Sequence, residues 1–224
     1  MEEANRITTG SDALDDLLNG GYETDIVTTV YGPSASGKSN LAMLAAAANA
    51  DGKVVFVDTE SGLSVRRLQQ LSEDSETVLE NTMVLQPSSL DEQGAAIEKL
   101  KNTLNEDVNL VVVDSIAMLY RLEIAKKNDV QETNQQLAEQ SANLIRIARD
   151  KMIPVLVTNQ VYHDFDDDSS VNLVGGDILK YGSKCLVELE EDEEGRLATI
   201  RKHRSMAAGK QIRFRIENSG VVAD

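Results

Sequence analysis

The chain has 224 residues, with 38 acidic and 22 basic side chains, a formal net charge of −16 and a pI near 4.5. This length suits one large domain with a sizeable core. The strong negative charge excludes a protein that coats nucleic acid with a broadly basic surface. Aromatic residues make up 4% of the sequence and tryptophan is absent, which disfavours a surface that stacks many bases.

Nothing in the sequence indicates a membrane or an exported protein. No apolar run approaches the roughly 20 residues that a transmembrane helix needs. The first ten residues, MEEANRITTG, do not have the charged-then-apolar order of a secretion signal. Cys185 is the single cysteine, so a disulfide framework is impossible and a buried thiol is the expected role. We therefore expect a cytoplasmic protein without a membrane partner.

Strands and helices alternate along most of the chain. A short tail (1–7) is followed by a predicted helix at 11–21, SDALDDLLNGG, which begins at a capping serine and is stopped by two glycines. Apolar periodicity then predicts strands at 25–31, 53–58, 81–86, 109–114 and 153–159, and helices at 38–50, 64–71, 89–106 and 129–151. Such alternation predicts an α/β fold with a mainly parallel central sheet and helices on both faces.

The pattern changes near the C-terminus. Residues 184–203 and 210–217 are typical of antiparallel strands, with EDEEG (191–195) as a hairpin turn. We expect this segment, 184–217, to extend the edge of the sheet and not to form a second domain. The prediction is therefore one domain over 1–224.

The segment YGPSASGKSN (31–40) has the spacing of a phosphate-binding P-loop, between a predicted strand and an alanine-rich helix. The glycines let successive N–H groups turn toward a triphosphate at a helix N-terminus, a lysine reaches the β and γ phosphates, and a serine hydroxyl ligates Mg²⁺. The predicted nucleotide-binding residues are Gly32, Pro33, Ser34, Ala35, Ser36, Gly37, Lys38, Ser39 and Asn40. We expect Lys38 to be solvated when no nucleotide is bound.

Polar side chains follow three of the predicted strands, where ligands of parallel sheets bind. Asp114 ends LVVVDS, the Walker B form in which an aspartate orients Mg²⁺. Asp58 and Glu60 follow the neighbouring strand, and a carboxylate there is either the acceptor of a proton from water or an exposed loop residue. Asn159 and Gln160 are either sensors of the γ-phosphate or satisfied amides at the edge of the core.

Taken in order, six segments resemble the RecA/RadA recombinase family, and in particular its short archaeal members that consist of a bare ATPase core. The segments are TTGSDALDDLLNGGYETDIVTTVYGPSASGKSNLA, VDTESGLSVRRL, LVVVDS, VTNQV, GGDILKYGSKCLVELE and IRKHRS. The resemblance covers essentially the whole chain. It implies a RecA-type P-loop ATPase core that uses ATP and Mg²⁺. It also implies an accessory role in homologous recombination and DNA repair, beside a main recombinase, with weak or DNA-dependent hydrolysis.

The resemblance also assigns roles to single residues. Glu60 becomes the catalytic base, Lys38 assists catalysis at the phosphates, and Gln160 becomes the sensor that couples nucleotide state to the DNA-binding loop. Lys202 and Arg204, in KHRS, resemble residues that reach the ATP of a neighbouring subunit. This implies a possible homo-oligomer with ATP at the subunit interface.

Two segments correspond to the DNA loops of this family. The second, 161–177, contains no lysine or arginine, so it cannot supply the phosphate contacts that carry most DNA affinity. The first contains Arg121, Lys126 and Lys127, which we predict to bind DNA modestly and in a salt-sensitive way. Residues 196–215 hold seven basic residues and no acidic one. They either neutralise phosphate or form a strand face balanced by the neighbouring acidic turn.

A second class of function stays open. A KaiC-like regulatory ATPase, which acts through a protein partner without DNA, has a similar start to its core. The segments YRLE and KHRS favour the recombination class.

Overall fold

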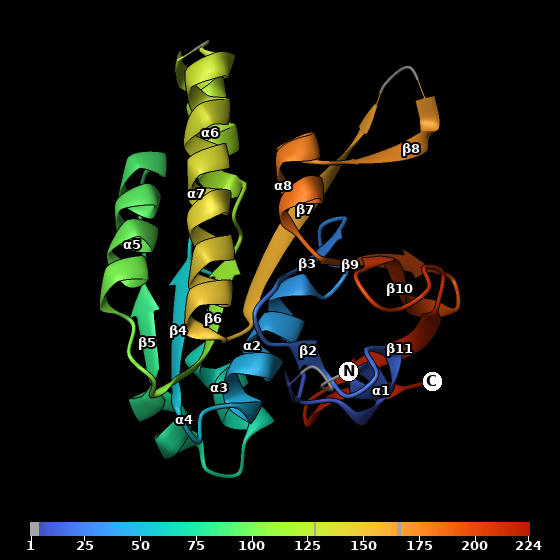
Figure 1. The fold of residues 1–224 in the computed structure, drawn as a ribbon. Helices are drawn as coiled ribbons and strands as arrows, with labels where there is room; N and C mark the ends of the chain where they lie inside the picture. The colour runs from blue at the N-terminus through green and yellow to red at the C-terminus, as the bar shows by residue number, and fades with distance from the viewer. Residues whose placement is uncertain (1–4, 128, 165–166) are drawn as a thin grey trace.

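The computed structural model describes residues 5–127, 129–164 and 167–224, which form a twisted sheet flanked by helices (Figure 1). The strands are β1 (Arg6–Ile7), β2 (Tyr22–Glu23), β3 (Val27–Gly32), β4 (Lys53–Asp58), β5 (Thr82–Leu85), β6 (Val108–Asp114), β7 (Val155–Asp164), β8 (Asp167–Leu173), β9 (Cys185–Asp192), β10 (Gly195–His203), β11 (Gln211–Glu217) and β12 (Gly220–Ala223). The helices are α1 (Asp12–Leu17), α2 (Lys38–Ala48), α3 (Val65–Leu71), α4 (Ser75–Asn81), α5 (Leu90–Thr103), α6 (Met118–Lys127), α7 (Val130–Lys151) and α8 (Gly176–Gly182). No helix in these ranges is both long and apolar enough to cross a membrane.

The main sheet has the strand order β12-β11-β10-β9-β3-β7-β6-β4-β5, with β8 paired to β7 beside this path. Strands β9, β3, β7, β6, β4 and β5 run parallel, and β10, β11 and β12 add antiparallel pairs at one edge. The central strands are continuous runs of β-branched residues, as expected for parallel strands that are covered on both faces. The RecA-type fold predicted from the sequence is confirmed.

Alternate residues of each central strand supply two separate layers of core. In β4, Val54 and Phe56 pack on the side of α2, whereas Val55 and Val57 pack on the side of α5 and α7. All four side chains are fully buried. Because successive side chains of a strand point to opposite faces, helices must cover both faces of the sheet. This holds the carboxyl ends of the parallel strands side by side at one edge.

The predicted C-terminal extension is confirmed, with one refinement of its topology. Strand β9 pairs antiparallel with β10 but parallel with β3, at Thr28↔Cys185 through Tyr31↔Glu188. The extension is therefore continuous with the parallel sheet and lies directly beside the strand that leads into the P-loop (Figure 1).

The two predicted DNA loops are not loops where the structure describes them. Residues Met118–Lys127 form helix α6, because MLYRLEIAKK consists largely of strong helix formers and its Leu119 and Tyr120 are buried. The second segment extends β7 into a hairpin with β8, which rises from the sheet beside α8 (Figure 1). The expectation of a loop is wrong for the helix α6 and for the strands β7 and β8; in the second segment, Val174 and Gly175 form a turn, and 165–166 lie outside the described residues.

Several local elements were not anticipated. The helix α4 and the strand β12 had no clear sequence signal, and part of the expected tail is strand β1, paired with β2. Ser11 precedes α1 but does not cap it with its side chain; its hydroxyl donates to the carbonyl of Val221 at 2.8 Å. A distant strand has therefore replaced the local partner that the sequence suggested.

Candidate nucleotide-binding site

The P-loop connects β3 to α2, and each of its glycines has a distinct structural reason. Gly37, the N-cap of α2, has φ of 108°, a left-handed conformation that glycine adopts without strain. At Gly32, a Cβ atom would lie 2.3 Å from the backbone oxygen of Leu189 in β9. Both glycines were expected to let a ligand come close to the backbone, but Gly32 is required because the neighbouring strand β9 leaves no room for a side chain.

A cavity of about 170 Å³ opens at the carboxyl ends of the parallel strands. Its lining residues are Ser34, Ala35, Gly37, Lys38, Ser39, Asn40, Glu60, Asp114 and Gln160. Residues from three separate strands therefore meet the P-loop, but Gln160, which the sequence placed after a strand end, lies within β7, where its pairing with β3 stops. Gly32, Pro33 and Ser36 are not among the lining residues, although they were predicted to bind nucleotide. A larger cavity, of about 650 Å³, lies beside α8 and includes Lys202, but none of the P-loop.

Lys38 is buried, and the expectation of a solvated lysine is wrong. Its side-chain nitrogen donates to the carbonyl of Gly32 at 2.9 Å and to that of Pro33 at 2.6 Å. Burial lowers the pKa of Lys38, and the negative charges of Glu60 and Asp114 partly offset this effect. The P-loop backbone thus holds the ammonium group at the cavity wall, where it faces two carboxylates.

Asp114 and Ser39 form the part of the site that suits a magnesium ion. Asp114 is 2% exposed, accepts a hydrogen bond from the hydroxyl of Thr158, and is hydrogen-bonded to Ser39. Burial raises the pKa of Asp114, the two hydrogen bonds lower it, and the charges of Glu60 and Asp58 raise it further. Carboxylate and hydroxyl oxygens are the hard ligands that Mg²⁺ prefers. A cation would also relieve the repulsion among these carboxylates.

Two of the polar residues at the strand ends have structural roles. Asp58 accepts hydrogen bonds from the backbone N–H groups of Gly62, at 3.0 Å, and Leu63, at 3.2 Å, which closes the turn after β4. Asn159 is fully buried and donates to the carbonyl of Val174 at 2.8 Å. Asn159 is therefore the satisfied amide that the sequence offered as one alternative, whereas Asp58 is a buried residue that closes a turn and matches neither alternative. Of the polar residues predicted to follow the strands, Glu60 and Gln160 line the cavity together with Asp114, whereas Asp58 and Asn159 are not among its lining residues.

Glu60 is held by two hydrogen bonds to one of its oxygens. The Oε1 atom accepts from the hydroxyl of Ser115 at 2.7 Å and from Nε2 of Gln160 at 3.0 Å. The carbonyl end of the Gln160 amide accepts from Nη1 of Arg121 at 2.7 Å. A residue predicted to bind DNA is therefore connected to the candidate catalytic base through the candidate sensor.

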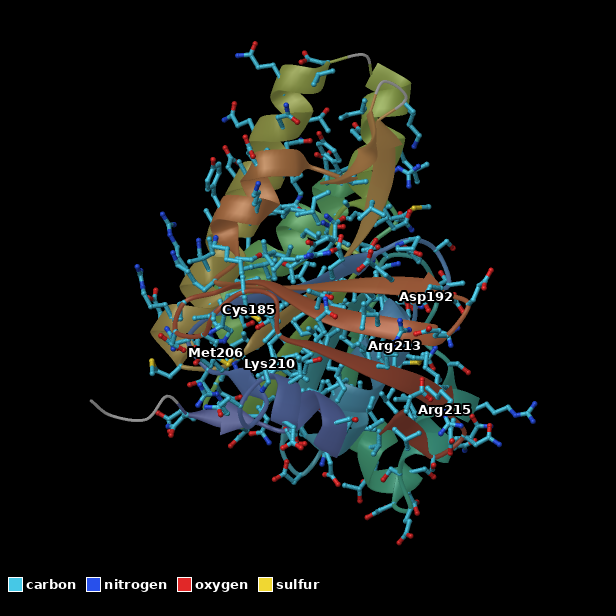
Figure 2. All side chains as sticks on the ribbon, turned by 90° about the vertical axis from the view of Figure 1, so that its right-hand side faces the viewer. Cys185, Asp192, Met206, Lys210, Arg213 and Arg215 are labelled. Carbon is cyan, nitrogen blue, oxygen red and sulfur yellow. The ribbon has the colours of Figure 1, made fainter. Side chains whose placement is uncertain are left out.

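The basic segment 196–215 is balanced by acidic and carbonyl groups. The five arginines of the segment form ion pairs: Arg196 with Glu191, Arg201 with Glu188, Arg204 with Glu23 and Asp25, Arg213 with Asp192 and Glu194, and Arg215 with Asp224. The two lysines donate to backbone carbonyls, Lys202 to those of Lys180 and Ser183, and Lys210 to that of Asp16. Figure 2 shows Asp192, at the end of β9, and Arg213, on β11, at the same end of the sheet, with β10 between their strands. The structure favours the balanced strand face over a free phosphate-binding surface.

Lys202 and Arg204 lie away from the cavity of their own chain. Lys202 pairs with Leu186, which pairs with Thr29 of β3. At about 3.3 Å per residue, this position is roughly 10 Å before Gly32 along the strand. Neither residue lines the cavity at the P-loop. Their contact with the ATP of a neighbouring subunit therefore stays a prediction.

Two arginines that the sequence did not single out flank the P-loop. Nε of Arg67 donates to the side chain of Asn40 at 2.9 Å, and its Nη1 donates to the carbonyl of Asn218 at 2.9 Å. Nη2 of Arg196 lies 3.5 Å from the carbonyl of Ala35. Arg67 had no signal beyond its place in an amphipathic helix. Arg196 was counted only as one member of the basic segment.

The predicted DNA-binding residues lie on α6. Arg121 and Lys126 are exposed, and Arg121 is engaged with Gln160. The side chain of Lys127 lies outside the described residues, although its backbone ends the helix. Their contact with DNA stays a prediction.

A P-loop lies between a parallel strand and a helix, and an aspartate, a glutamate and a glutamine from the neighbouring strands β6, β4 and β7 face the same cavity, which defines the chain as a RecA-type P-loop ATPase fold. The Rad51 family model matches residues 2–224, and the chain belongs to this family.

Proteins of similar length resemble this chain in sequence, and one solved structure resembles it in fold. The chain is 39% identical to the DNA repair and recombination protein RadB of Methanobrevibacter smithii, over 99% of this chain and 97% of the relative. It is 40% identical to the protein of the same name from Methanococcus maripaludis, over 93% and 96%. A crystal structure of the RadB recombinase superposes with a TM-score of 0.83, at 35% identity, over 97% of this chain and 99% of that chain. The resemblance to the RecA/RadA family is confirmed.

Proposed function

We propose that this chain binds ATP with Mg²⁺ at the P-loop, hydrolyses it slowly, and acts as an accessory protein in homologous recombination and DNA repair. The convergence of the P-loop, Glu60, Asp114 and Gln160 on one cavity carries the nucleotide part of the proposal. The relatives, each a DNA repair and recombination protein by name, support the cellular role.

The P-loop residues would bind the triphosphate. Backbone N–H groups at the start of α2 offer donors where the helix dipole favours negative charge. The ammonium group of Lys38 would exchange its two carbonyl partners for phosphate oxygens, which are stronger acceptors because they are charged. Ser39 and Asp114 would hold the Mg²⁺, which supplies charge neutralisation at the phosphates.

Glu60 is the group in the cavity best suited to take a proton from an attacking water. One of its oxygens accepts from Ser115 and Gln160, which fixes the carboxylate, and the other oxygen is left to receive the proton. Gln160 bonds this carboxylate and lines the same cavity, so its amide would respond to a γ-phosphate. This supports its proposed role as the sensor.

DNA binding would be modest, since the net charge of −16 repels a polyanion and many basic residues of the described segments are paired with groups of the same chain. Arg121, Lys126 and Lys127 are the proposed contacts. Lys202 and Arg204 would act only in an oligomer, after leaving their partners within the chain. The alternative of a KaiC-like regulatory ATPase is not favoured, because relatives that match nearly the whole chain are recombination proteins.

Glu60→Gln tests the proposed hydrolysis. The variant should bind ATP with wild-type affinity and hydrolyse it about 10²- to 10⁴-fold more slowly, because an amide cannot accept the proton. Calorimetric titration with a slowly hydrolysed ATP analogue gives the affinity, and phosphate release gives the rate. A variant that retains the wild-type rate would assign the base to another residue.

A further inference from the structure

Thr59, which lies between the end of β4 and Glu60, bonds to the neighbouring strand β6 at three points. Its backbone N–H donates to the carbonyl of Asp114 at 2.8 Å. Its Oγ1 atom donates to the carbonyl of Ser115 at 2.8 Å and accepts from the backbone N–H of Ser115 at 3.0 Å. The threonine therefore continues the connection between β4 and β6 one residue past their last strand pair, Asp58 and Asp114.

Ser115 carries this connection to Glu60. The serine hydroxyl donates to Oε1 of Glu60 at 2.7 Å, and Ser115 is 1% exposed. The amide of Gln160 donates to the same oxygen at 3.0 Å, but that bond is exposed to solvent. A hydrogen bond shielded from water is electrostatically stronger than one in water. The Ser115 bond is therefore the stronger of the two, and the backbone that carries it is held by Thr59.

The backbone on the other side of Glu60 is fixed by a turn. Ser61 has φ of 54°, a left-handed conformation that a serine adopts only at a cost in energy. The carboxylate of Asp58 closes this turn by accepting from two backbone N–H groups that follow Ser61. Glu60 thus lies between a closed turn and an anchor to β6, so its place is tied to the strand that ends in Asp114.

We propose that Thr59 and Ser115 are positioning residues, which together hold Glu60 in a fixed place relative to Asp114, the candidate metal ligand. This inference rests on the proposed role of Glu60 as the base. A general base must lie within about 2.6–3.2 Å of the group whose proton it takes. A misplacement of about 1 Å can lower a rate by about a hundredfold. Neither Thr59 nor Ser115 is among the residues that line the nucleotide cavity, so both act through Glu60.

The first test follows the Glu60 carboxylate itself and does not need turnover. In protein whose glutamate carries ¹³C at the side-chain carboxyl carbon, the Glu60 signal is identified by its loss in Glu60→Gln. It should shift in Ser115→Ala and in Thr59→Val, and it should keep its position in Thr59→Ser, which retains the hydroxyl group. Ser183→Ala is the matched control, because it removes another buried serine hydroxyl, which is hydrogen-bonded to Thr29 at 2.7 Å. An unchanged Glu60 signal in Thr59→Val would overturn the proposal.

The second test separates the rate of hydrolysis from the affinity for nucleotide. In single-turnover measurements, Thr59→Val and Ser115→Ala should each hydrolyse bound ATP about 10- to 100-fold more slowly, as expected for a displaced base. Their affinity for a slowly hydrolysed ATP analogue should equal that of wild type, because the P-loop is unchanged. Thr59→Ser and Ser183→Ala should match wild type in both measurements. In a Glu60→Gln background, Ser115→Ala should slow hydrolysis no further, because the hydroxyl acts through the carboxylate.

The outcomes separate this inference from the proposed function. Wild-type rates in Thr59→Val and Ser115→Ala, or an effect of Ser115→Ala that persists in the Glu60→Gln background, would refute the positioning role while Glu60 stays the base. A rate that falls equally in Ser183→Ala would assign the effect to lost stability and would also refute it. A wild-type rate in Glu60→Gln would instead refute the proposed base. The ¹³C signal would then still report whether the two hydroxyl groups position the carboxylate.

Discussion

Replacing Lys38 by methionine should destabilise the fold in the absence of nucleotide. The ammonium group donates to the carbonyls of Gly32 and Pro33, and it faces the carboxylates of Glu60 and Asp114. Methionine keeps the length and the apolar part of the side chain, so the change is confined to the charged end. The two carbonyls lose a donor, and the positive charge that faces the two carboxylates is removed.

The expected magnitude follows from these contacts. Two hydrogen bonds at about 1 kcal/mol each give about 2 kcal/mol. The cost of burying the ammonium group, which is also what lowers the pKa of Lys38, opposes this gain. We therefore expect a net loss of about 1 kcal/mol, which corresponds to roughly 2–4 °C in Tm for a chain of this size.

Urea and thermal unfolding without nucleotide measure this loss. Lys99→Met is the matched control, because Lys99 is an exposed lysine on α5 and methionine is as good a helix former. The control should unfold like wild type. A Lys38→Met variant with a midpoint equal to or above that of wild type would show that the carbonyl contacts contribute nothing. Calorimetry should show that the same variant has lost ATP binding.

Three further predictions concern stability and DNA. Burial raises the pKa of Asp114, so the contribution of this one group to the free energy of unfolding falls as pH rises above the ordinary aspartate value of 3.8. The urea midpoint of Asp114→Asn should therefore exceed that of wild type by a margin that widens from about pH 4 to about pH 7, and a constant margin would contradict this. Gly32→Ala should lower the free energy of unfolding by roughly 1–3 kcal/mol, because the added Cβ would lie 2.3 Å from a backbone oxygen. Gly62→Ala, where a Cβ would meet no atom within 4 Å, is the control and should leave the urea midpoint nearly unchanged. The affinity for DNA should fall as salt rises, with a slope of about −3 in log K against log salt concentration, measured by fluorescence anisotropy. The double variant Lys126→Glu, Lys127→Glu should flatten that slope, and an unchanged slope would place the DNA contacts elsewhere.

The sequence alone determined the parts of this protein that depend on local pattern. Runs of β-branched residues and 3.6-residue periodicity located the central strands and the long helices. Once those strands were known to be parallel, their carboxyl ends had to lie at one edge. The meeting of Glu60, Asp114 and Gln160 at the P-loop followed from this and is what the structure shows.

The tertiary structure decided which partner each polar group takes. Lys38 is buried against its own loop, the hydroxyl of Ser11 bonds to Val221, and Gly32 is required by Leu189 of β9. Each of the last two contacts joins residues more than a hundred positions apart in the sequence. Their existence depends on the register between strands, which no local pattern encodes.

The same limit explains the two segments whose function the sequence left open. Acidic residues of β9 and of the turn after it neutralise several basic residues of the segment 196–215, and the pairing of β10 with both β9 and β11 brings the two signs together. Likewise, Arg121 and Gln160 are 39 residues apart and belong to different elements, so their hydrogen bond forms only once α6 lies beside the middle of β7. Local sequence determined which residues carry charge, and the packing of distant elements determined what each charge contacts, because a side chain bonds to the nearest suitable group in space and not in sequence.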